Sequence, residues 1–210
     1  MLTLFDFDAS PNCLKTKILL KELGISYTQR NMTRAELRGA EYRAMFPTGY
    51  APAIQDGELR LAESAAIALY LAGKHGQLRP RDPAREALMF QALSVEASLL
   101  APTVGGQGLF GELFKPAAEQ NAPRIAELRE KAVRVGQILG ELLGDKPYFA
   151  EELSIADIQL YAAVSKSLSA GAFGQAPANL VAWCERMSAR PSVQAARQEY
   201  IHYRSAEAAA

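Results

Sequence analysis

The sequence predicts a two-part protein: an α/β domain in residues 1–76, a linker in residues 77–83 and an all-α helical domain in residues 84–210. Within the first part, short β-prone runs alternate with helical runs in the order βαβαββα, which requires a mixed sheet with helices on both faces. Beyond the linker, apolar residues recur at spacings of three and four, which is typical of helices that bury one face.

The first half of the α/β domain is predicted as strand, helix and strand. Leu2 to Phe7 is apolar and β-prone, Pro11 to Leu23 reads as a helix, and Ser26 to Met32 is a second strand-like run. Ser10 stands where it can cap the helix, proline suits the first helical position, and Gly24 provides a stop.

The second half adds a hairpin between two helical segments. Arg34 to Phe46 reads as a charged helix or helical loop. Pro52 to Gln55 and Leu59 to Ala62 form a predicted hairpin across an Asp-Gly turn, and Ala65 to Ala72 closes the domain as a helix.

The composition changes at residues 77–83, where QLRPRDP offers two prolines, two arginines and almost nothing to bury. The next stripe predicts a helix that ends at Pro102; its members are Leu88, Ala92, Val95 and Leu99. Ile125 to Leu142 keeps a helical face over five turns. The run Ser154 to Asp157 fits a capping box, and the helix that it opens is apolar on nearly every side, as expected for the middle of a helical domain.

Charge and composition exclude several classes of protein. The 210 residues carry 23 basic and 23 acidic side chains, of which residues 1–76 hold 9 and 8 and the remainder 14 and 15, so neither part has the basic excess of a nucleic-acid-binding module. No signal peptide and no run near the roughly 18 apolar residues of a membrane span is recognised, so we expect a cytoplasmic protein without nucleic-acid or membrane partners. Two distant cysteines and two histidines predict neither a disulfide scaffold nor a metal site.

The segment Pro47 to Leu71 predicts a site for a small peptide-like anion. It contains a Gly-X-X-Pro turn ending at Pro52 and the pair Glu63-Ser64 at the start of a helix. A proline that enters a strand presents the backbone groups of the preceding residue, and a serine at a helix start adds a hydroxyl to unpaired N–H groups suited to a carboxylate.

Five segments in order carry a resemblance to a known family: SPNCLKTKILLKELGISY, PTGYAPAI, LAESAAIALYL, LSIADIQLY and NLVAWCERMSARPSVQAA. Along essentially its whole length, the chain resembles the cytosolic glutathione transferases. The resemblance implies a thioredoxin-like N-terminal domain, an all-helical C-terminal domain, a homodimer, and glutathione as cosubstrate without a metal.

The resemblance implies that Ser10 activates the glutathione thiol, as in the tau, phi and zeta classes, and that Asn12 approaches the same sulfur, as in the nu class. A thiol of pKa near 8.5 is only ~3% ionised at pH 7, and lowering its pKa by two units takes about 2.7 kcal/mol. A hydrogen bond to a charged group contributes roughly 1.5 to 3 kcal/mol. Ser10 is alternatively a plain N-cap, and Asn12 alternatively satisfies only the first helical turn.

The cysteines fit a catalytic role less well. The omega-class cysteine corresponds to Ser10 and the beta-class cysteine to Asn12, so Cys13 coincides with neither position. We therefore expect Cys13 to be a small buried residue and Cys184, beside Trp183, to belong to the core.

The resemblance also implies which residues contact each part of glutathione. Glu63 and Ser64 match the pair that holds the γ-glutamyl group, while Ala51 and a cis Pro52 match the residues that pair with the cysteinyl backbone. Many members have Lys or Gln before Val-Pro where this chain has Tyr50-Ala51, so a basic residue between Arg34 and Arg43 is expected to contact the glycine end.

The electrophile is expected to bind between the domains, beside the helix that begins at Pro83. The alternative is that the same side chains form core; the candidates are Phe90, Leu93, Glu96, Leu100, Phe110 and Phe114. The run from Gly105 to Gly111 lacks the Gly-Lys-Ser/Thr ending of a phosphate loop and follows a helix, so it is read as a mobile connection over this pocket.

These observations predict a glutathione transferase of the detoxification type that transfers glutathione to a small hydrophobic electrophile. A glutathione-dependent peroxide or disulfide reductase is the alternative if Asn12 matters and Ser10 does not. A non-catalytic interaction module, like the similar domains of translation factors and stringent starvation regulators, is the other alternative. The presence of Ser10 together with Glu63-Ser64 argues against such a module.

Overall fold

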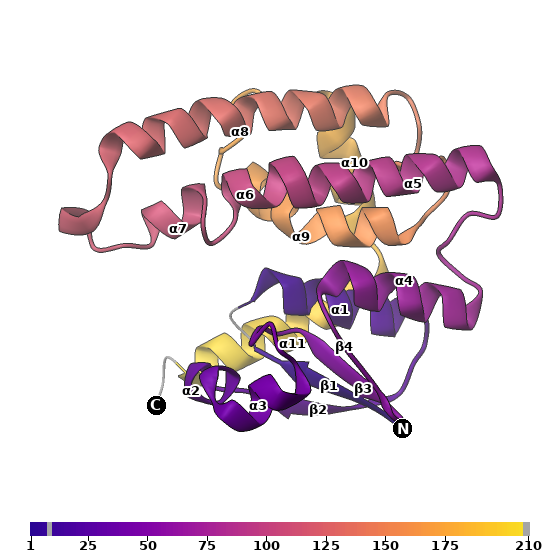
Figure 1. Ribbon diagram of the computed structural model, residues 1–210. Coiled ribbons are helices and arrows are strands. Elements are labelled where there is room, and N and C mark those ends of the chain that lie inside the picture. The colour runs from indigo at the N-terminus through magenta and orange to yellow at the C-terminus, as the bar shows by residue number, and fades with distance from the viewer. Residues whose placement is uncertain (8–9, 208–210) are drawn as a thin grey trace. The chain divides into compact units, whose positions relative to one another are not determined.

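The computed structural model describes residues 1–7 and 10–207, with side chains described through residue 199. Its contacts divide the chain into two compact units, Met1–Arg79 with Ala189–Ala210 and Pro80–Ser188 (Figure 1).

The first unit is built on a four-stranded mixed sheet. The strands are β1 (Leu2–Asp6), β2 (Tyr27–Asn31), β3 (Ala53–Asp56) and β4 (Leu59–Ala62), in the order β2-β1-β3-β4. β1 runs parallel to β2 and antiparallel to β3, and β4 is antiparallel to β3. The predicted βαβαββα order and mixed sheet are confirmed.

Helices cover both faces of this sheet. α1 (Pro11–Glu22) and α4 (Ser64–His75) pack together on one face, and α2 (Arg34–Arg38) and α3 (Ala40–Met45) lie on the other (Figure 1). Between α2, α3 and the sheet is a buried apolar cluster of Phe5, Met32, Leu37, Tyr42, Phe46 and Ala53.

The segment predicted as one helix over Arg34 to Phe46 is two short helices. The chain leaves the helical conformation at Gly39, whose φ of −68° and ψ of 153° are extended. A capping box between Thr33 and Glu36 begins α2, and Gly39 then serves as the N-cap residue of α3. The break turns Leu37 and Tyr42 into the same apolar cluster, which one straight helix of this pattern does not achieve.

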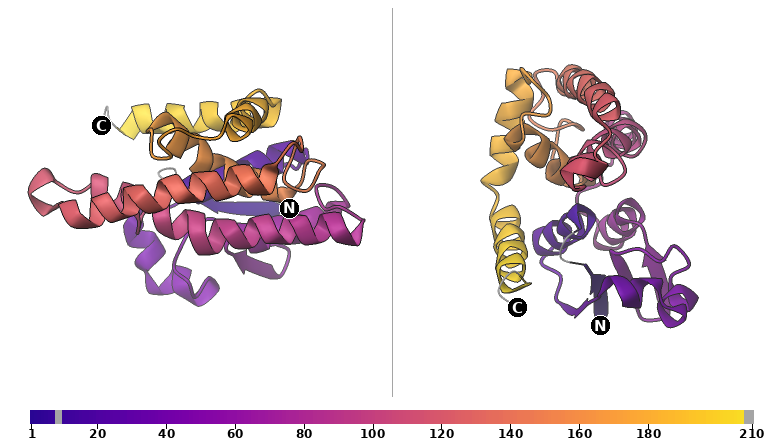
Figure 2. Two further views of the ribbon diagram at one scale, coloured as in Figure 1. Left: turned by 90° about the horizontal axis from the view of Figure 1, so that it is seen from above. Right: turned by 90° about the vertical axis from the view of Figure 1, so that its left-hand side faces the viewer.

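The C-terminal helix α11 (Pro191–Glu207) belongs to the first unit by its contacts, whereas the sequence analysis placed it in the helical domain of residues 84–210. It runs beside α1, as both views of Figure 2 show. Glu22 of α1 binds both Arg190 and Ser192 at the start of α11, and Lys21 Nζ lies 2.6 Å from Glu199 Oε1.

The second unit is helical throughout. Its long elements surround α9, whose first eight residues, Ile155 to Ala162, are all buried, which confirms the expected central helix. The elements are α5 (Pro83–Val95), η1 (Glu96–Leu100), α6 (Ala101–Val104), α7 (Leu109–Leu113), η2 (Ala117–Glu119), α8 (Ala122–Leu143), α9 (Ile155–Ser169) and α10 (Ala178–Ser188).

The predicted helix end at Pro102 is wrong. The chain passes from α5 through the π-helical turn η1 into α6, and Pro102 is the second residue of α6. The wider π turn shifts the buried face by one position. Leu100 is therefore fully buried while Leu99, the last residue of the predicted stripe, is 39% exposed.

The predicted capping box at Ser154 is confirmed and lies at the centre of a buried hydrogen-bond network. Asp157 Oδ2 accepts bonds from the N–H and the hydroxyl of Ser154 at 3.0 and 3.1 Å. Asp157 Oδ1 accepts bonds from Phe149 N–H at 3.2 Å and from Trp183 Nε1 at 2.9 Å. One carboxylate thus joins the start of α9 to α10 and to the preceding loop.

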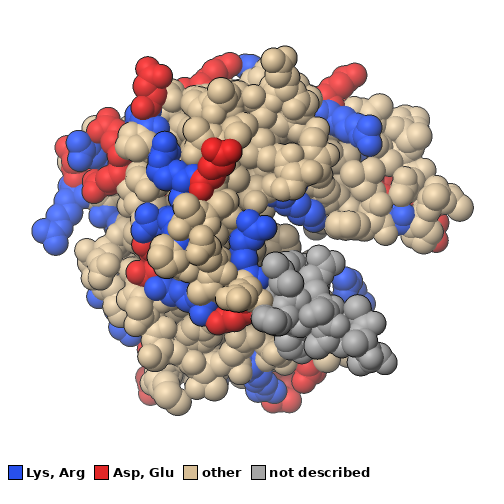
Figure 3. All heavy atoms as spheres, turned by 180° about the vertical axis from the view of Figure 1, so that it is seen from behind, with Lys and Arg blue, Asp and Glu red and all other residues tan. Residues whose placement is uncertain are grey.

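The surface and the long helices bear on the classes of partner. On the face drawn in Figure 3, acidic and basic side chains are interspersed. By length and composition alone, the stretch Pro83–Leu113 is apolar enough to cross a membrane, with a mean hydropathy of 1.4, a property that core helices of soluble proteins share.

Candidate functional site

The predicted glutathione-binding residues of the first unit gather at one end of the sheet. The register pairs Phe5 of β1 with Ala53 of β3, and Ala53 with Ala62 of β4. Pro52 and Glu63 therefore lie at the same level, one residue beyond these pairs, beside the end of β1. Neighbouring strands are about 4.8 Å apart, so three strands span roughly 10 Å, which is also the length of an extended tripeptide.

Ser10 is the N-cap residue of α1, but its side chain makes no capping hydrogen bond. Its φ of −93° and ψ of 120° are extended, and its N–H donates to Phe7 O at 2.8 Å, which closes the turn after β1. The hydroxyl is thus not used by the helix start, and the plain N-cap alternative does not describe it.

Asn12 is the second residue of α1 and is exposed. Among the described residues, its side-chain amide has no hydrogen-bond partner, so it does not satisfy the first helical turn. Ser10 and Asn12 therefore both lie at the start of α1, where the Ser10 side chain interacts with Cys13 and the Asn12 amide has no partner among the described residues.

Cys13 is buried, as the sequence analysis expects. Its side chain has no exposed surface, and its Sγ accepts a hydrogen bond from Phe7 N–H at 3.3 Å. Burial, with a further contribution from the negative charge of Asp6, raises the pKa of the Cys13 thiol well above its usual range. The thiol is protonated at neutral pH, which is unsuited to a nucleophile.

A buried ion pair lies between β1 and α1. Lys17 Nζ is 2.5 Å from Asp6 Oδ2, and both side chains are essentially unexposed. Gln29 Nε2 donates to the same oxygen at 2.9 Å. Losing one partner of such a pair leaves an uncompensated buried charge, so the pair fixes the end of β1 that leads to Ser10. The sequence analysis missed it, since neither residue stands in a motif.

The peptide bond between Ala51 and Pro52 is cis, which confirms the conformation that the resemblance implied. The preceding residue is held by Tyr42, whose hydroxyl donates to Tyr50 O at 2.9 Å. The ring of Tyr42 is itself fixed in the apolar cluster, with its centroid 5.1 Å from that of Phe46. Tyr42 thus supports the loop, a role that no motif in the sequence indicated.

Glu63 has a strained backbone at the start of α4. Its φ is 71° and its ψ 118°, a conformation that a non-glycine residue adopts at a cost of about 1 to 3 kcal/mol. Such strain concentrates at binding sites. Ser64 follows as the first residue of a 12-residue helix, so its backbone N–H belongs to the positive end of the helix dipole.

Two arginines of the predicted basic segment lie beside the turn that precedes Ser10 and beside the loop that precedes Pro52. The guanidinium of Arg34 lies 5.5 Å from the ring centroid of Phe7, whose carbonyl oxygen accepts the Ser10 bond. Arg43 Nε lies 3.1 Å from where a β-carbon would stand on Gly49, two residues before Ala51. Each of these exposed arginines therefore lies beside one of the loops at this end of the sheet.

The predicted electrophile-pocket residues all belong to the second unit. Leu93, Glu96, Leu100 and Phe110 are buried, whereas Phe90 is 40% exposed and Phe114 72% exposed. The structure brings together Phe110 and Phe114, which stack with centroids 6.4 Å apart. Glu96 opens the π turn, a feature that often marks functional sites.

The predicted glycine run contains the start of α7. A β-carbon on Gly108 would lie 2.3 Å from Thr103 O, and one on Gly111 would lie 1.9 Å from Gly106 O. These close backbone approaches explain the glycines there. Among the residues that the structure describes, no three His, Cys, Asp or Glu side chains are grouped as metal ligands.

Comparison with known proteins identifies relatives of both units. The pattern of the glutathione S-transferase N-terminal domain matches residues 4–80, and that of the C-terminal domain matches residues 106–191. A GST-like protein of Streptococcus mutans is 30% identical over 89% of this chain and 78% of its own length. Glutathione S-transferase GstB of Escherichia coli is 29% identical over 92% of this chain and 96% of its own.

The fold of this chain is also similar to that of a solved glutathione transferase. A glutathione transferase from Pseudomonas putida, crystallised with one glutathione disulfide per subunit, is 28% identical. The match covers 93% of this chain and 90% of that one, with a TM-score of 0.83. With both family patterns, full-length relatives and the shared fold in agreement, this chain belongs to the glutathione S-transferase family.

Proposed function

We propose that this protein is a glutathione transferase that binds glutathione at the end of the sheet formed by β1, β3 and β4. The observation that supports the proposal is the register, which pairs Phe5 with Ala53 and Ala53 with Ala62, so that Ala51-Pro52 and Glu63-Ser64 adjoin the end of β1 that precedes Ser10 in the chain. The choice of glutathione as the ligand is supported by the Pseudomonas putida relative, which was crystallised with glutathione disulfide.

Each part of the tripeptide has a partner of matching chemistry. The Ser64 hydroxyl and N–H, at the positive end of α4, receive the γ-glutamyl carboxylate, and Glu63 receives its ammonium group. The backbone of Ala51 pairs with the cysteinyl residue. Arg43 and Arg34, which lie beside the two loops, are the candidates for the glycine carboxylate.

Ser10 then acts on the sulfur. Its hydroxyl donates a hydrogen bond to the thiolate, which favours loss of the thiol proton to solvent, and the first turn of α1 adds roughly 0.3 to 1 kcal/mol. A charge-assisted bond of roughly 1.5 to 3 kcal/mol approaches the 2.7 kcal/mol that a two-unit fall in pKa needs. The thiolate sulfur forms a bond to the electrophilic carbon, and a leaving group departs with its electron pair.

The electrophile is proposed to be small and hydrophobic, with Phe90, Leu93, Glu96, Phe110 and Phe114 as its candidate contacts. Their apolar surface suits such a molecule, and the π turn at Glu96 is consistent with a site on that helix. A homodimer in the cytoplasm is proposed from family membership.

The test is a glutathione titration followed by thiolate absorbance. Wild type should bind with a lowered thiol pKa, Ser10→Ala should bind but lose about one to two pKa units of the shift, and Ser64→Ala should bind about tenfold more weakly. Ser26→Ala, at an exposed position away from the site, is the matched control. Absence of binding by wild type would overturn the proposal in favour of a non-catalytic module.

A glutathione-dependent disulfide or peroxide reductase is the second candidate. The Asn12 amide, which has no hydrogen-bond partner among the described residues, and the glutathione disulfide bound by the Pseudomonas putida relative favour it. If Asn12→Ala loses peroxide or disulfide reductase activity while Ser10→Ala retains it, the protein is a reductase and the transferase proposal is wrong. Cys13→Ser should keep activity in either case, because the thiol is buried and protonated.

A further inference from the structure

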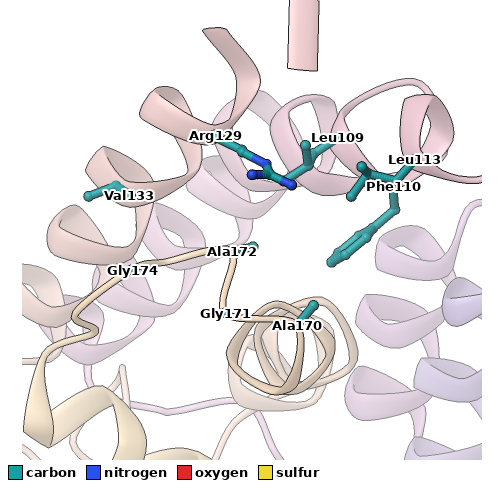
Figure 4. Close-up of a pocket in the computed structure, with 9 residues that line it drawn as sticks. All are labelled: Leu109, Phe110, Leu113, Arg129, Val133, Ala170, Gly171, Ala172 and Gly174. Atoms are coloured by element: carbon teal, nitrogen blue, oxygen red, sulfur yellow. The ribbon is translucent and has the colours of Figure 1, made fainter. Parts of the chain in front are cut away.

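The thiol of Cys13 is a buried reactive group that the proposed steps do not use. Cys13 is the third residue of α1 and has no exposed surface. It belongs to the first unit together with Ser10. The pocket drawn in Figure 4, by contrast, lies in the helical unit and includes Phe110, already a candidate contact of the electrophile.

A buried carboxylate anchors the surroundings of this thiol. Cys13 and Lys17 are four positions apart in α1 and therefore share one of its faces. Both contact Asp6, the last residue of β1, and Lys17 Nζ lies 2.5 Å from Asp6 Oδ2. Gln29 Nε2, from β2, donates to the same oxygen at 2.9 Å. The Asp6 carboxylate is thus held from two different elements.

The Cys13 thiol joins this carboxylate to Ser10. Its Sγ accepts a hydrogen bond from Phe7 N–H at 3.3 Å, and its side chain also forms hydrogen bonds with the side chains of Asp6 and Ser10. Burial and then the charge of Asp6 raise the pKa of the thiol, whereas the hydrogen bonds of Phe7 and Ser10 act in the opposite direction. This pattern is expected when the thiol donates its proton to Asp6 and the sulfur accepts from Phe7 and Ser10.

The contact with Cys13 decides where the Ser10 hydroxyl points. A serine at the N-cap position ordinarily accepts a hydrogen bond from the N–H of the second or third helical residue, here Asn12 or Cys13. The Ser10 side chain makes no such bond. Its proton is directed instead to a neutral sulfur, which is a weak acceptor. A thiolate is a charged and stronger acceptor, so the glutathione sulfur can take over this hydrogen bond.

We propose that Cys13 is a positioning residue for Ser10. Its sulfur keeps the Ser10 hydroxyl out of the capping rotamer and holds the O–H as a donor until the glutathione thiolate accepts it. The inference rests on the proposed function. It assigns Cys13 no contact with glutathione and no covalent step.

The contact itself is tested without glutathione, by infrared spectroscopy of the S–H stretching band. Cys184→Ala serves as the background, because Cys13 is then the single thiol of the chain. The stretch responds to hydrogen bonds at the thiol, so adding Ser10→Ala to this background should shift the Cys13 band. Adding Ser26→Ala, at an exposed position, is the matched control and should leave the band in place.

The consequence for catalysis is tested by the thiolate absorbance of bound glutathione. Cys13→Ala should bind glutathione with wild-type affinity, which also shows that it is folded, but the pKa of the bound thiol should rise by about half to one unit. Cys13→Ser should restore the wild-type pKa, because its hydroxyl can replace both side-chain hydrogen bonds of the thiol. Cys184→Ala makes the same change at the other buried cysteine and should match wild type.

Three results would overturn the inference and leave the glutathione site intact. The first is an S–H band that Ser10→Ala does not shift, which decides the matter even if Cys13→Ala does not fold. The second is a wild-type pKa of the bound thiol in Cys13→Ala when Ser10→Ala raises it. The third is a raised pKa that Cys13→Ser does not restore. If wild type does not lower the thiol pKa of glutathione, the proposed function itself fails, and this inference fails with it.

Discussion

Replacing Asp157 by asparagine should markedly destabilise the helical unit. The carboxylate accepts four hydrogen bonds, two on each oxygen, from Ser154, Phe149 and Trp183. Asparagine has one carbonyl oxygen, so its NH₂ group would face two buried donors. Each buried donor left unsatisfied costs about 1 to 3 kcal/mol, for a total of roughly 2 to 6 kcal/mol.

Part of this cost is offset. Burial raises the pKa of the Asp157 carboxyl, while the hydrogen bonds from Trp183, Ser154 and Phe149 act in the opposite direction. Asparagine removes the buried charge, so we expect a net loss of about 2 to 4 kcal/mol. With a urea m-value near 2 kcal/mol/M, the midpoint should fall by about 1 to 2 M.

The assay has a local reporter, because Trp183 is the one tryptophan of the chain and is fully buried against Asp157. Urea unfolding is followed by its fluorescence, with far-ultraviolet circular dichroism as a second probe. Asp145→Asn makes the same chemical change at an exposed position and should leave the midpoint unchanged. If Asp157→Asn matched that control, the reasoning about the buried network would be refuted.

Three further predictions concern a pH-dependent contact, a strained residue and a close approach. Burial by itself would raise the pKa of the Glu22 carboxyl, but Arg190 and Ser192 lower that pKa below its usual value. The ionised Glu22 carboxylate therefore stabilises the folded protein above about pH 4.3, and this contribution is lost as the pH falls through the folded-state pKa. The difference in unfolding midpoint between wild type and Glu22→Gln should therefore narrow between about pH 7 and pH 3, and a constant difference would contradict this. Glu63→Ala should weaken glutathione binding about tenfold, and Glu63→Gly, which relieves the positive φ, should be more stable than Glu63→Ala by about 1 kcal/mol in urea unfolding; equal midpoints would argue against strain. Gly136→Ala should lower the free energy of unfolding by up to about 2 kcal/mol, because the new β-carbon would lie 2.8 Å from the buried Phe173 ring. The same change at the exposed helical Gly73 should raise the free energy of unfolding slightly, and equal effects at the two positions would contradict the packing argument.

Elements with local signals were predictable from sequence. The capping box at Ser154, the amphipathic face of α8 and the Asp-Gly hairpin depend on residues only a few positions apart. The break at Gly39 and the π turn at Glu96 were not predictable, because glycine is tolerated inside helices and the π turn has no distinct periodicity over five residues.

The candidate site divides in the same way. Ser10, Ala51-Pro52 and Glu63-Ser64 were identified from motifs and from the family resemblance, and their roles stay predictions. The Asp6–Lys17 pair and the Tyr42 bond to Tyr50 were not foreseen. They join residues on different elements, whose approach depends on packing and not on spacing along the chain.

The sequence by itself determined the two-part architecture, the family and the candidate contacts to glutathione, because periodicity, caps and motifs are properties of neighbouring residues. Only the tertiary structure decided that α11 packs on α1, that the pKa of the Cys13 thiol is raised by burial and by Asp6, and that the Ser10 hydroxyl is not used as a cap. Burial, pKa and the pairing of charges depend on groups distant in sequence, so they follow from the folded packing alone.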